Sequence, residues 1–238
     1  MFSFEVWLVL GVVGFYLYDL IMLLSINELL LTKSDKGWSY KFPEFSYQLL
    51  RKYLLLPNPL TPDVAIFRVS WPKEPSSSAN DNRLVDFISI LEPIQASINT
   101  LLLLLLLFIP MVSLVYGSGT KLLIIFGMIY IFILTALVYI FNNRDKLYLS
   151  NGKFLSLAFE SIACPPFALN MVRKISLNYP NLGDPAHFAK HMFDGTSKSK
   201  FCKDLNKSIS KDMTFLDVDS RRYLRLQSYL NSSKEILS

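Results

Sequence analysis

The chain has 238 residues, of which 52% are hydrophobic and 18% charged, and its formal net charge at pH 7 is +5. This composition, with a mean hydropathy of +0.34, is more apolar than that of an ordinary soluble domain and points to a lipid bilayer. The excess positive charge does not indicate a nucleic-acid partner. Acidic residues are interleaved with the basic ones, and no long basic stripe with interleaved aromatic residues is present.

The first predicted element is an apolar run from Val6 to Ile26, whose only charged residue is Asp19. A helix needs roughly 20 apolar residues to cross the hydrocarbon core, and this run is long enough. It does not resemble a secretory signal, because no Lys or Arg precedes it and the run is long. Residues 1–26 are therefore predicted to form a first transmembrane helix.

Two further apolar runs predict a transmembrane hairpin over residues 94–141. The runs Ile94–Tyr116 and Leu122–Phe141 contain no charged residue, and only the short segment Gly117–Lys121 separates them. A connection this short makes the two helices antiparallel neighbours.

The distribution of Lys and Arg predicts the orientation of the three spans. These residues concentrate in segments 27–93 and 142–238, whereas none precedes the first run and the hairpin turn holds only Lys121. Basic loops stay on the cytoplasmic side, so the amino terminus is predicted outside and the carboxyl terminus inside. The predicted fold class is an all-α integral membrane protein with three transmembrane helices and a small, mainly helical cytoplasmic region, located as a multi-pass protein in the cell (inner or plasma) membrane.

The cytoplasmic segment 27–93 is predicted to be ordered with a loose end. Residues 46–56 have the pattern of a short amphipathic helix, and the β-branched and aromatic run 64–71 predicts a short strand. The serine-rich stretch 74–82 is predicted to be a flexible link into the second span.

The carboxyl-terminal region 142–238 contains a further apolar stretch, 154–172, which is long enough for a fourth span. Four features argue against a crossing: Glu160, Asn170, the Pro165-Pro166 pair and the basic residues that follow. We interpret the stretch as two short helices, the second starting at Pro165, that lie at the membrane interface or pack on the cytoplasmic segment, and a re-entrant placement is left open. Farther on, Asp184 is predicted to cap a short helix, and residues 217–237 a terminal helix whose arginines contact lipid or a partner: Arg221, Arg222 and Arg225.

No motif in the sequence carries a specific chemistry. His187 and His191 are spaced one helical turn apart, but Cys164 and Cys202 lack the close pairing of zinc motifs, so the histidines are weak metal candidates and no cofactor is predicted. No nucleophile or nucleotide motif appears. Glu160, beside Ser161 and Cys164, is interpreted as a helix-packing feature, so the sequence favours a non-enzymatic protein.

Asp19 is the most informative single residue, because a carboxylate inside a span is costly. Counting 1.5 Å per residue from the predicted cytoplasmic ends places Asp19, Asn99, Thr100 and Thr135 at a similar depth. The hypothesis is a polar layer between helices. Three alternatives remain: the span slides so that Asp19 reaches the headgroups, Asp19 only locks helix packing, or it carries protons or ions.

The predicted function is that of an accessory or scaffold subunit of a membrane complex, acting through its cytoplasmic module. The predicted partners are the lipid bilayer and either other proteins or further copies of the chain, and not nucleic acid. The alternative is a small homo-oligomeric channel or transporter subunit that uses Asp19 and the polar layer. A membrane-bound enzyme is the third possibility.

Overall fold

The computed structural model describes residues 4–34, 37–43, 48–49, 52–71, 81–116, 119–180 and 182–237. The chain is mostly helical and divides into two compact units, each assembled from three separate stretches of sequence. The helical unit comprises Met1–Ile21, Leu56–Ala65 and Val85–Tyr179, and the mixed unit comprises Met22–Leu55, Ile66–Leu84 and Pro180–Ser238. The units reflect contacts within the chain and do not test the predicted division into transmembrane and cytoplasmic segments. That division stays a prediction.

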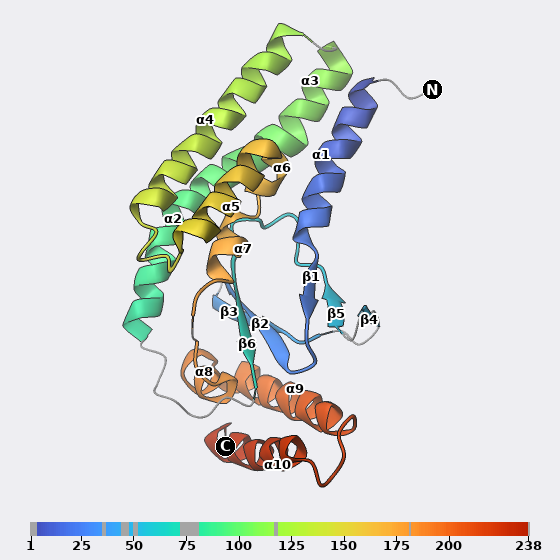
Figure 1. Ribbon diagram of the computed structural model, residues 1–238, viewed down its shortest axis with the longest axis vertical. Helices are drawn as coiled ribbons and strands as arrows, with labels where there is room; N and C mark the ends of the chain where they lie inside the picture. The colour runs from blue at the N-terminus through green and yellow to red at the C-terminus, as the bar shows by residue number, and fades with distance from the viewer. Residues whose placement is uncertain are drawn as a thin grey trace. The chain divides into compact units, whose positions relative to one another are not determined.

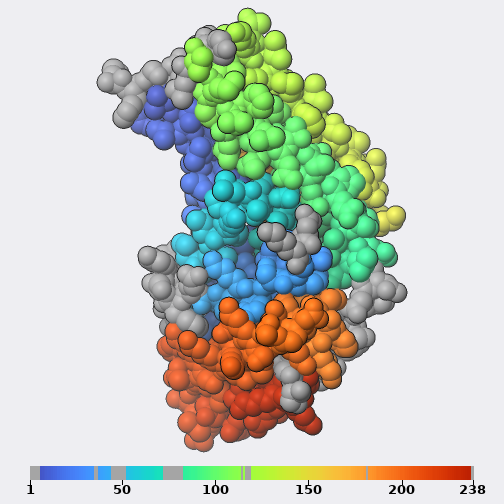
Figure 2. Space-filling model, turned by 180° about the vertical axis from the view of Figure 1, so that it is seen from behind, coloured from blue at the N-terminus to red at the C-terminus, as the bar shows by residue number. Residues whose placement is uncertain are grey.

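Two long helical stretches dominate the helical unit (Figure 1). The first consists of α2 (Asp81–Leu103), a π-helical turn η1 (Leu104–Phe108) and α3 (Ile109–Tyr116), and the second is α4 (Thr120–Asn142). Figure 2 shows the surfaces of α3 and α4 side by side. Both stretches are long and apolar enough to cross a membrane.

Helix α4 is apolar on its buried and on its exposed sides. Ile129 and Ile133 are fully buried, whereas Leu123 and Ile131 on other faces are largely exposed. A helix that is hydrophobic all round suits a bilayer or the core of a large protein. The predicted third run thus coincides with a single helix, and the second with the later part of a helix that starts earlier, at Asp81.

Helix α1 (Phe4–Leu20) is shorter than predicted. Its 17 residues rise about 25 Å. The prediction of a helix up to Ile26 is wrong, because strand β1 (Met22–Leu24) follows directly and pairs with β5 (Lys52–Leu55), where Leu24 is fully buried. Non-local strand pairing outweighs the apolar helical pattern at this point.

After α4 the chain folds back on itself. Helix α5 (Asn151–Ala163) runs antiparallel along α4. The ring centroids of Phe154 and Phe141 lie 5.3 Å apart near one end, and the Tyr130 hydroxyl donates to the Ile162 carbonyl at 3.3 Å near the other. Two short helices, α6 (Pro165–Ala168) and α7 (Met171–Ser176), then lead the chain away. The predicted helix start at Pro165 is confirmed.

The mixed unit contains two small antiparallel sheets, which the all-α prediction missed. Their orders are β1-β5-β4 and β3-β2-β6, with the strands β2 (Glu28–Ser34), β3 (Gly37–Lys41), β4 (Gln48–Leu49) and β6 (Ala65–Ser70) completing them. The strand predicted over 64–71 is confirmed as β6. The helix predicted over 46–56 is wrong, because its described residues form β4 and β5, and Tyr53 and Leu55 are buried in alternation. Most of the predicted link 74–82 lies outside the described residues.

Three helices complete the mixed unit: α8 (Pro185–Met192), α9 (Gly195–Met213) and α10 (Arg221–Leu237). The buried face of α9 packs through Phe201, whose ring lies 4.9 Å from that of Tyr40 on β3 and 5.3 Å from that of Phe193. The predicted cap of α8 is confirmed, because Asp184 accepts hydrogen bonds from the backbone N–H groups of Ala186 and His187.

This cap yields a prediction with a matched control. Replacing Asp184 by Ala removes both hydrogen bonds and should lower the free energy of unfolding by about 1–2 kcal/mol. Asp194 precedes α9 in the same way but makes no side-chain cap bond, so Asp194→Ala should change stability by less than about 0.5 kcal/mol. Denaturant unfolding in detergent, followed by circular dichroism, measures both; equal effects of the two substitutions would contradict the assigned cap.

Candidate functional site

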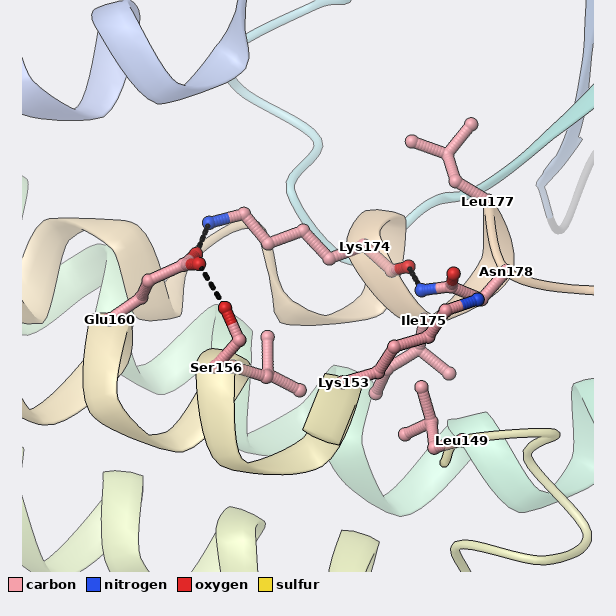
Figure 3. A pocket seen from close by; sticks show the side chains of 9 residues that line it. Leu149, Lys153, Ser156, Glu160, Lys174, Ile175, Leu177 and Asn178 are labelled. Carbon is pink, nitrogen blue, oxygen red and sulfur yellow. Dashed lines mark hydrogen bonds and ion pairs between the residues drawn. The ribbon is translucent and has the colours of Figure 1, made fainter. Parts of the chain in front are cut away.

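A charged cluster in the helical unit is centred on Lys174 of α7. The Lys174 ammonium lies 2.8 Å from Asp19 Oδ1 and 2.7 Å from Glu160 Oε2, and so joins the end of α1 to the last turn of α5. Figure 3 shows Lys174 extended toward Glu160. The Asp19 side chain is only 14% exposed, so the carboxylate points into the unit rather than outward.

Asn170 supplies the second contact to Asp19. Its Nδ2 donates to Asp19 Oδ2 at 2.9 Å, while its Oδ1 accepts from Arg173 Nη1 at 3.2 Å. Asn170 and Lys174 lie four residues apart, and therefore on the same face where α7 begins, which is why both reach one carboxylate. Each oxygen of Asp19 thus has its own donor.

Arg173 extends the cluster into the loop that crosses the helical unit. The side chain is 1% exposed, and its Nη2 donates to the backbone carbonyls of Asn58 and Thr61 at 2.7 and 2.5 Å. Burial lowers the pKa of Arg173, against the opposing effect of Tyr16 and Asp63, but a guanidinium remains protonated in proteins. A buried cation therefore holds residues 56–65 against α7.

Glu160 is the most exposed of the three charged partners of the bridge. Burial on its own would raise the pKa of Glu160, but hydrogen bonds from Lys174 and Ser156 hold it below its usual value of 4.5. Ser156 lies one turn before Glu160 on α5 and donates to Oε1 at 2.8 Å. The carboxylate is therefore charged at neutral pH.

A pocket opens beside this cluster (Figure 3). It has a volume of about 370 Å³ and lies between α5, α7 and the turn before α5. Lys153, Ser156 and Glu160 contribute its polar wall, and Leu157 and Ile175 part of its apolar wall. The charged groups of the pocket are largely engaged with one another.

Two other members of the predicted polar layer, Thr100 and Thr135, bond to the backbone of their own helices. Asn99 is exposed, the Thr100 hydroxyl donates to the Ala96 carbonyl at 3.1 Å, and the Thr135 hydroxyl to the Ile131 carbonyl at 2.8 Å. Threonine in a helix commonly bonds the carbonyl four residues earlier, which removes it from a layer between helices. The structure therefore pairs Asp19 with Asn170 and Lys174 instead, and the common depth of the four residues stays a prediction.

The sequence contains a signal for these partners, namely the polar residues within the apolar stretch 154–172 and the lysine that follows it. In the sequence, Glu160 and Asn170 argue against a fourth span, Glu160 is also interpreted as a helix-packing feature, and Lys174 is one of the basic residues that predict the topology. Polar residues within an apolar stretch that follows a span with a carboxylate are, however, natural partners for it, since ionisable groups in spans pair with one another.

The remaining predicted residues lie in the mixed unit. His187 is partly buried and His191 exposed on α8, and within the described residues no group of three or more His, Cys, Asp or Glu could hold a metal ion. Arg221 and Arg225 are exposed on α10. Arg222 instead lies 3.3 Å from the carboxylate of Asp212, which is buried in α9, so this arginine has a partner within the chain.

Comparison with known proteins finds no family model, no curated protein and no solved structure that matches this chain. The role of the cluster therefore has to follow from its own geometry and charge. Two carboxylates, one ammonium and one guanidinium balance in charge, and the three charged groups of the bridge come from α1, α5 and α7. Such an arrangement connects helices.

The bridge predicts energetic coupling between Asp19 and Lys174. Asp19→Asn and Lys174→Gln should each destabilise the protein, because each leaves a half-buried charge with a poorer partner. The double substitution should cost less than the sum of the two, with a coupling of about 1–3 kcal/mol. Unfolding in detergent measures this cycle; Thr135→Val, at an exposed hydroxyl bonded to its own helix, is the control and should be nearly neutral. Strict additivity would show that the bridge contributes nothing.

Glu160 predicts a pH dependence. A carboxyl whose folded pKa is lowered contributes stability that is present above its unfolded pKa, near 4.5, and lost as the pH falls through the lower folded value. The melting temperature of the wild type should therefore exceed that of Glu160→Gln at neutral pH. The difference should shrink below about pH 4.5; a difference that grows on acidification would refute the charged pairing.

Proposed function

We propose that this chain is a multi-pass membrane protein with a non-enzymatic role, an accessory or scaffold subunit whose mixed unit is its interaction module. The observation that carries the proposal is that each carboxylate oxygen of Asp19 already has a partner within the chain. A carboxylate that conducts protons or ions must exchange its partners during the cycle, whereas Asp19 is held by Lys174 on one oxygen and by Asn170 on the other. This favours the packing role for Asp19.

The membrane part of the proposal has three spans with the amino terminus outside and the carboxyl terminus inside. The long stretch α2–α3 and helix α4 supply two of them. Helix α1 supplies the third: it is about 25 Å long, and outward-facing side chains such as Trp7 and Leu10 are more than half exposed. Exposed apolar side chains on α1 and α4 are what a bilayer would cover.

The segment α5–α6 is then re-entrant. Its α5 is 13 residues long, or about 20 Å, so it follows α4 for part of the way and does not cross. Leu155, Phe159 and Ile162 form an exposed apolar stripe on α5, which suits contact with lipid tails. The polar side of the same helix carries Ser156 and Glu160 toward the cluster. The backbone of this turn is paired within the chain, as membrane depth requires: the Cys164 N–H donates to the Glu160 carbonyl at 3.0 Å, and the Phe167 N–H to the Cys164 carbonyl at 2.8 Å.

The mixed unit has the properties of an interaction module. It has its own aromatic core around Tyr40 and Phe201, so it can present a fixed surface. On α10, the exposed Leu224 lies between the exposed arginines Arg221 and Arg225. Apolar residues with arginine beside them are typical of protein interfaces.

Purification from native membranes tests the proposal. We expect the wild-type chain to copurify with a protein partner in fixed stoichiometry, and Arg221→Glu/Arg225→Glu to lose it. Lys203→Glu/Lys207→Glu, the same charge change on the exposed face of α9, is the matched control and should retain the partner. A pure homo-oligomer that conducts ions in planar bilayers, with conductance abolished by Asp19→Asn, would instead establish the channel.

A further inference from the structure

A second pocket of the helical unit is almost wholly apolar. Its volume is about 430 Å³, and its walls come from α1, η1, α4 and the turn between α5 and α6. The residues that define its shape are Trp7, Gly11, Phe15, Leu105, Phe126 and Pro165. None of its walls belongs to the charged cluster.

We propose that this pocket binds one hydrocarbon tail of a membrane phospholipid. Ligand pockets typically measure about 300–1,000 Å³ and have mostly hydrophobic and aromatic walls, as here. Trp7 and Phe15 stand 62% and 55% exposed at the pocket, so it opens to the surroundings of α1. The inference rests on the proposed membrane location, because only a bilayer surrounds α1 with acyl chains.

The dimensions favour an extended chain over a docked helix. An α-helix is at least about 10 Å across and rises 5.4 Å per turn, so a single turn would already fill roughly 430 Å³. A span of several turns cannot enter this space, whereas one acyl chain can lie within it. The tail of a phospholipid is the apolar chain that a bilayer supplies at every point of its core.

Several features of the backbone open the pocket. Gly11 has no side chain, and a Cβ placed there would meet no atom within 4 Å. Pro165 and Pro166 start α6 directly after α5, and both line the pocket, while Phe167 of α6 packs its ring edge-on against Phe15 of α1. Leu105 belongs to the π-helical turn, a local departure from α-helix that occurs frequently at functional sites.

Gly11 also provides the test, because it lines the pocket and a Cβ at this position meets no atom within 4 Å, so Gly11→Leu adds a side chain where the pocket has room. Gly127→Leu on α4 is the matched control: it makes the same change where a Cβ also meets nothing within 4 Å, at a position outside the pocket. A second filling variant, Val12→Phe, narrows the same pocket from the next residue of α1.

The probe is phosphatidylcholine with a photoactivatable diazirine near the end of one acyl chain. The full chain is reconstituted in phosphatidylcholine nanodiscs that contain this lipid, illuminated, and mapped by mass spectrometry. In the wild type and in Gly127→Leu, we expect labelling of residues 7–15 and 163–166 in excess of that on the exposed side chains of α4. Gly11→Leu and Val12→Phe should lose this excess and keep the labelling of α4, which also shows that they are folded and inserted.

Labelling that follows exposure alone along α1 and α4, or an excess that survives both filling variants, would overturn the tail site while leaving the membrane location intact. Failure of the wild-type chain to enter nanodiscs, with no labelling of α4, would overturn the membrane location and the tail site together. The two failures are therefore distinguishable by the labelling of α4.

Discussion

The helical unit depends on the ion pairs that the ammonium group of Lys174 makes with Asp19 and Glu160. This ammonium lies 2.8 Å from an oxygen of Asp19 and 2.7 Å from one of Glu160, so these two oxygens are at most 5.5 Å apart. Without the cation they would repel by about 3 kcal/mol at an effective dielectric constant of about 20. The carboxyl end of α1 and the polar face of α5 can therefore pack near each other only because α7 places a positive charge between them. The neighbouring Arg173 holds residues 56–65 through two backbone carbonyls, so a helix of six residues joins three other segments of the chain.

The distribution of polarity follows from this bridge. The charged groups face inward, where they balance one another, and the outward faces of α1, α4 and α5 are apolar. Most soluble proteins instead expose their charged side chains and bury their apolar ones. The apolar pocket at the α5–α6 turn lies about one helical turn beyond Glu160, so the charged bridge and the apolar cavity are neighbours along the same segment.

Local patterns predicted the elements that depend on local interactions. The third apolar run, the cap at Asp184, the strand over 64–71 and the helix start at Pro165 all follow from neighbouring residues. The end of α1 depends on the pairing of β1 with β5, between residues about 30 positions apart, as Leu24 with Tyr53 shows. Strand β4 pairs with β5 across a short connection, as Leu49 with Lys52 shows, and its helical prediction failed although this pairing is local. The partners of Asp19 are farther still, and no periodicity indicates them. The sequence thus contained Asp19 and the polar residues of the stretch 154–172, but nothing in it indicated that they lie together.

The separation of Asp19 from its partners also has a consequence for biosynthesis. Asn170 follows Asp19 by 151 residues, so at 5–20 residues per second the ribosome needs roughly 8–30 s to deliver it. Throughout that interval the newly made α1 carries a carboxylate whose donors, Asn170 and Lys174, have not yet been made. The amino-terminal helix can therefore settle into its final position only after Lys174 has been added, and its docking completes the helical unit, which ends at Tyr179, rather than starting it.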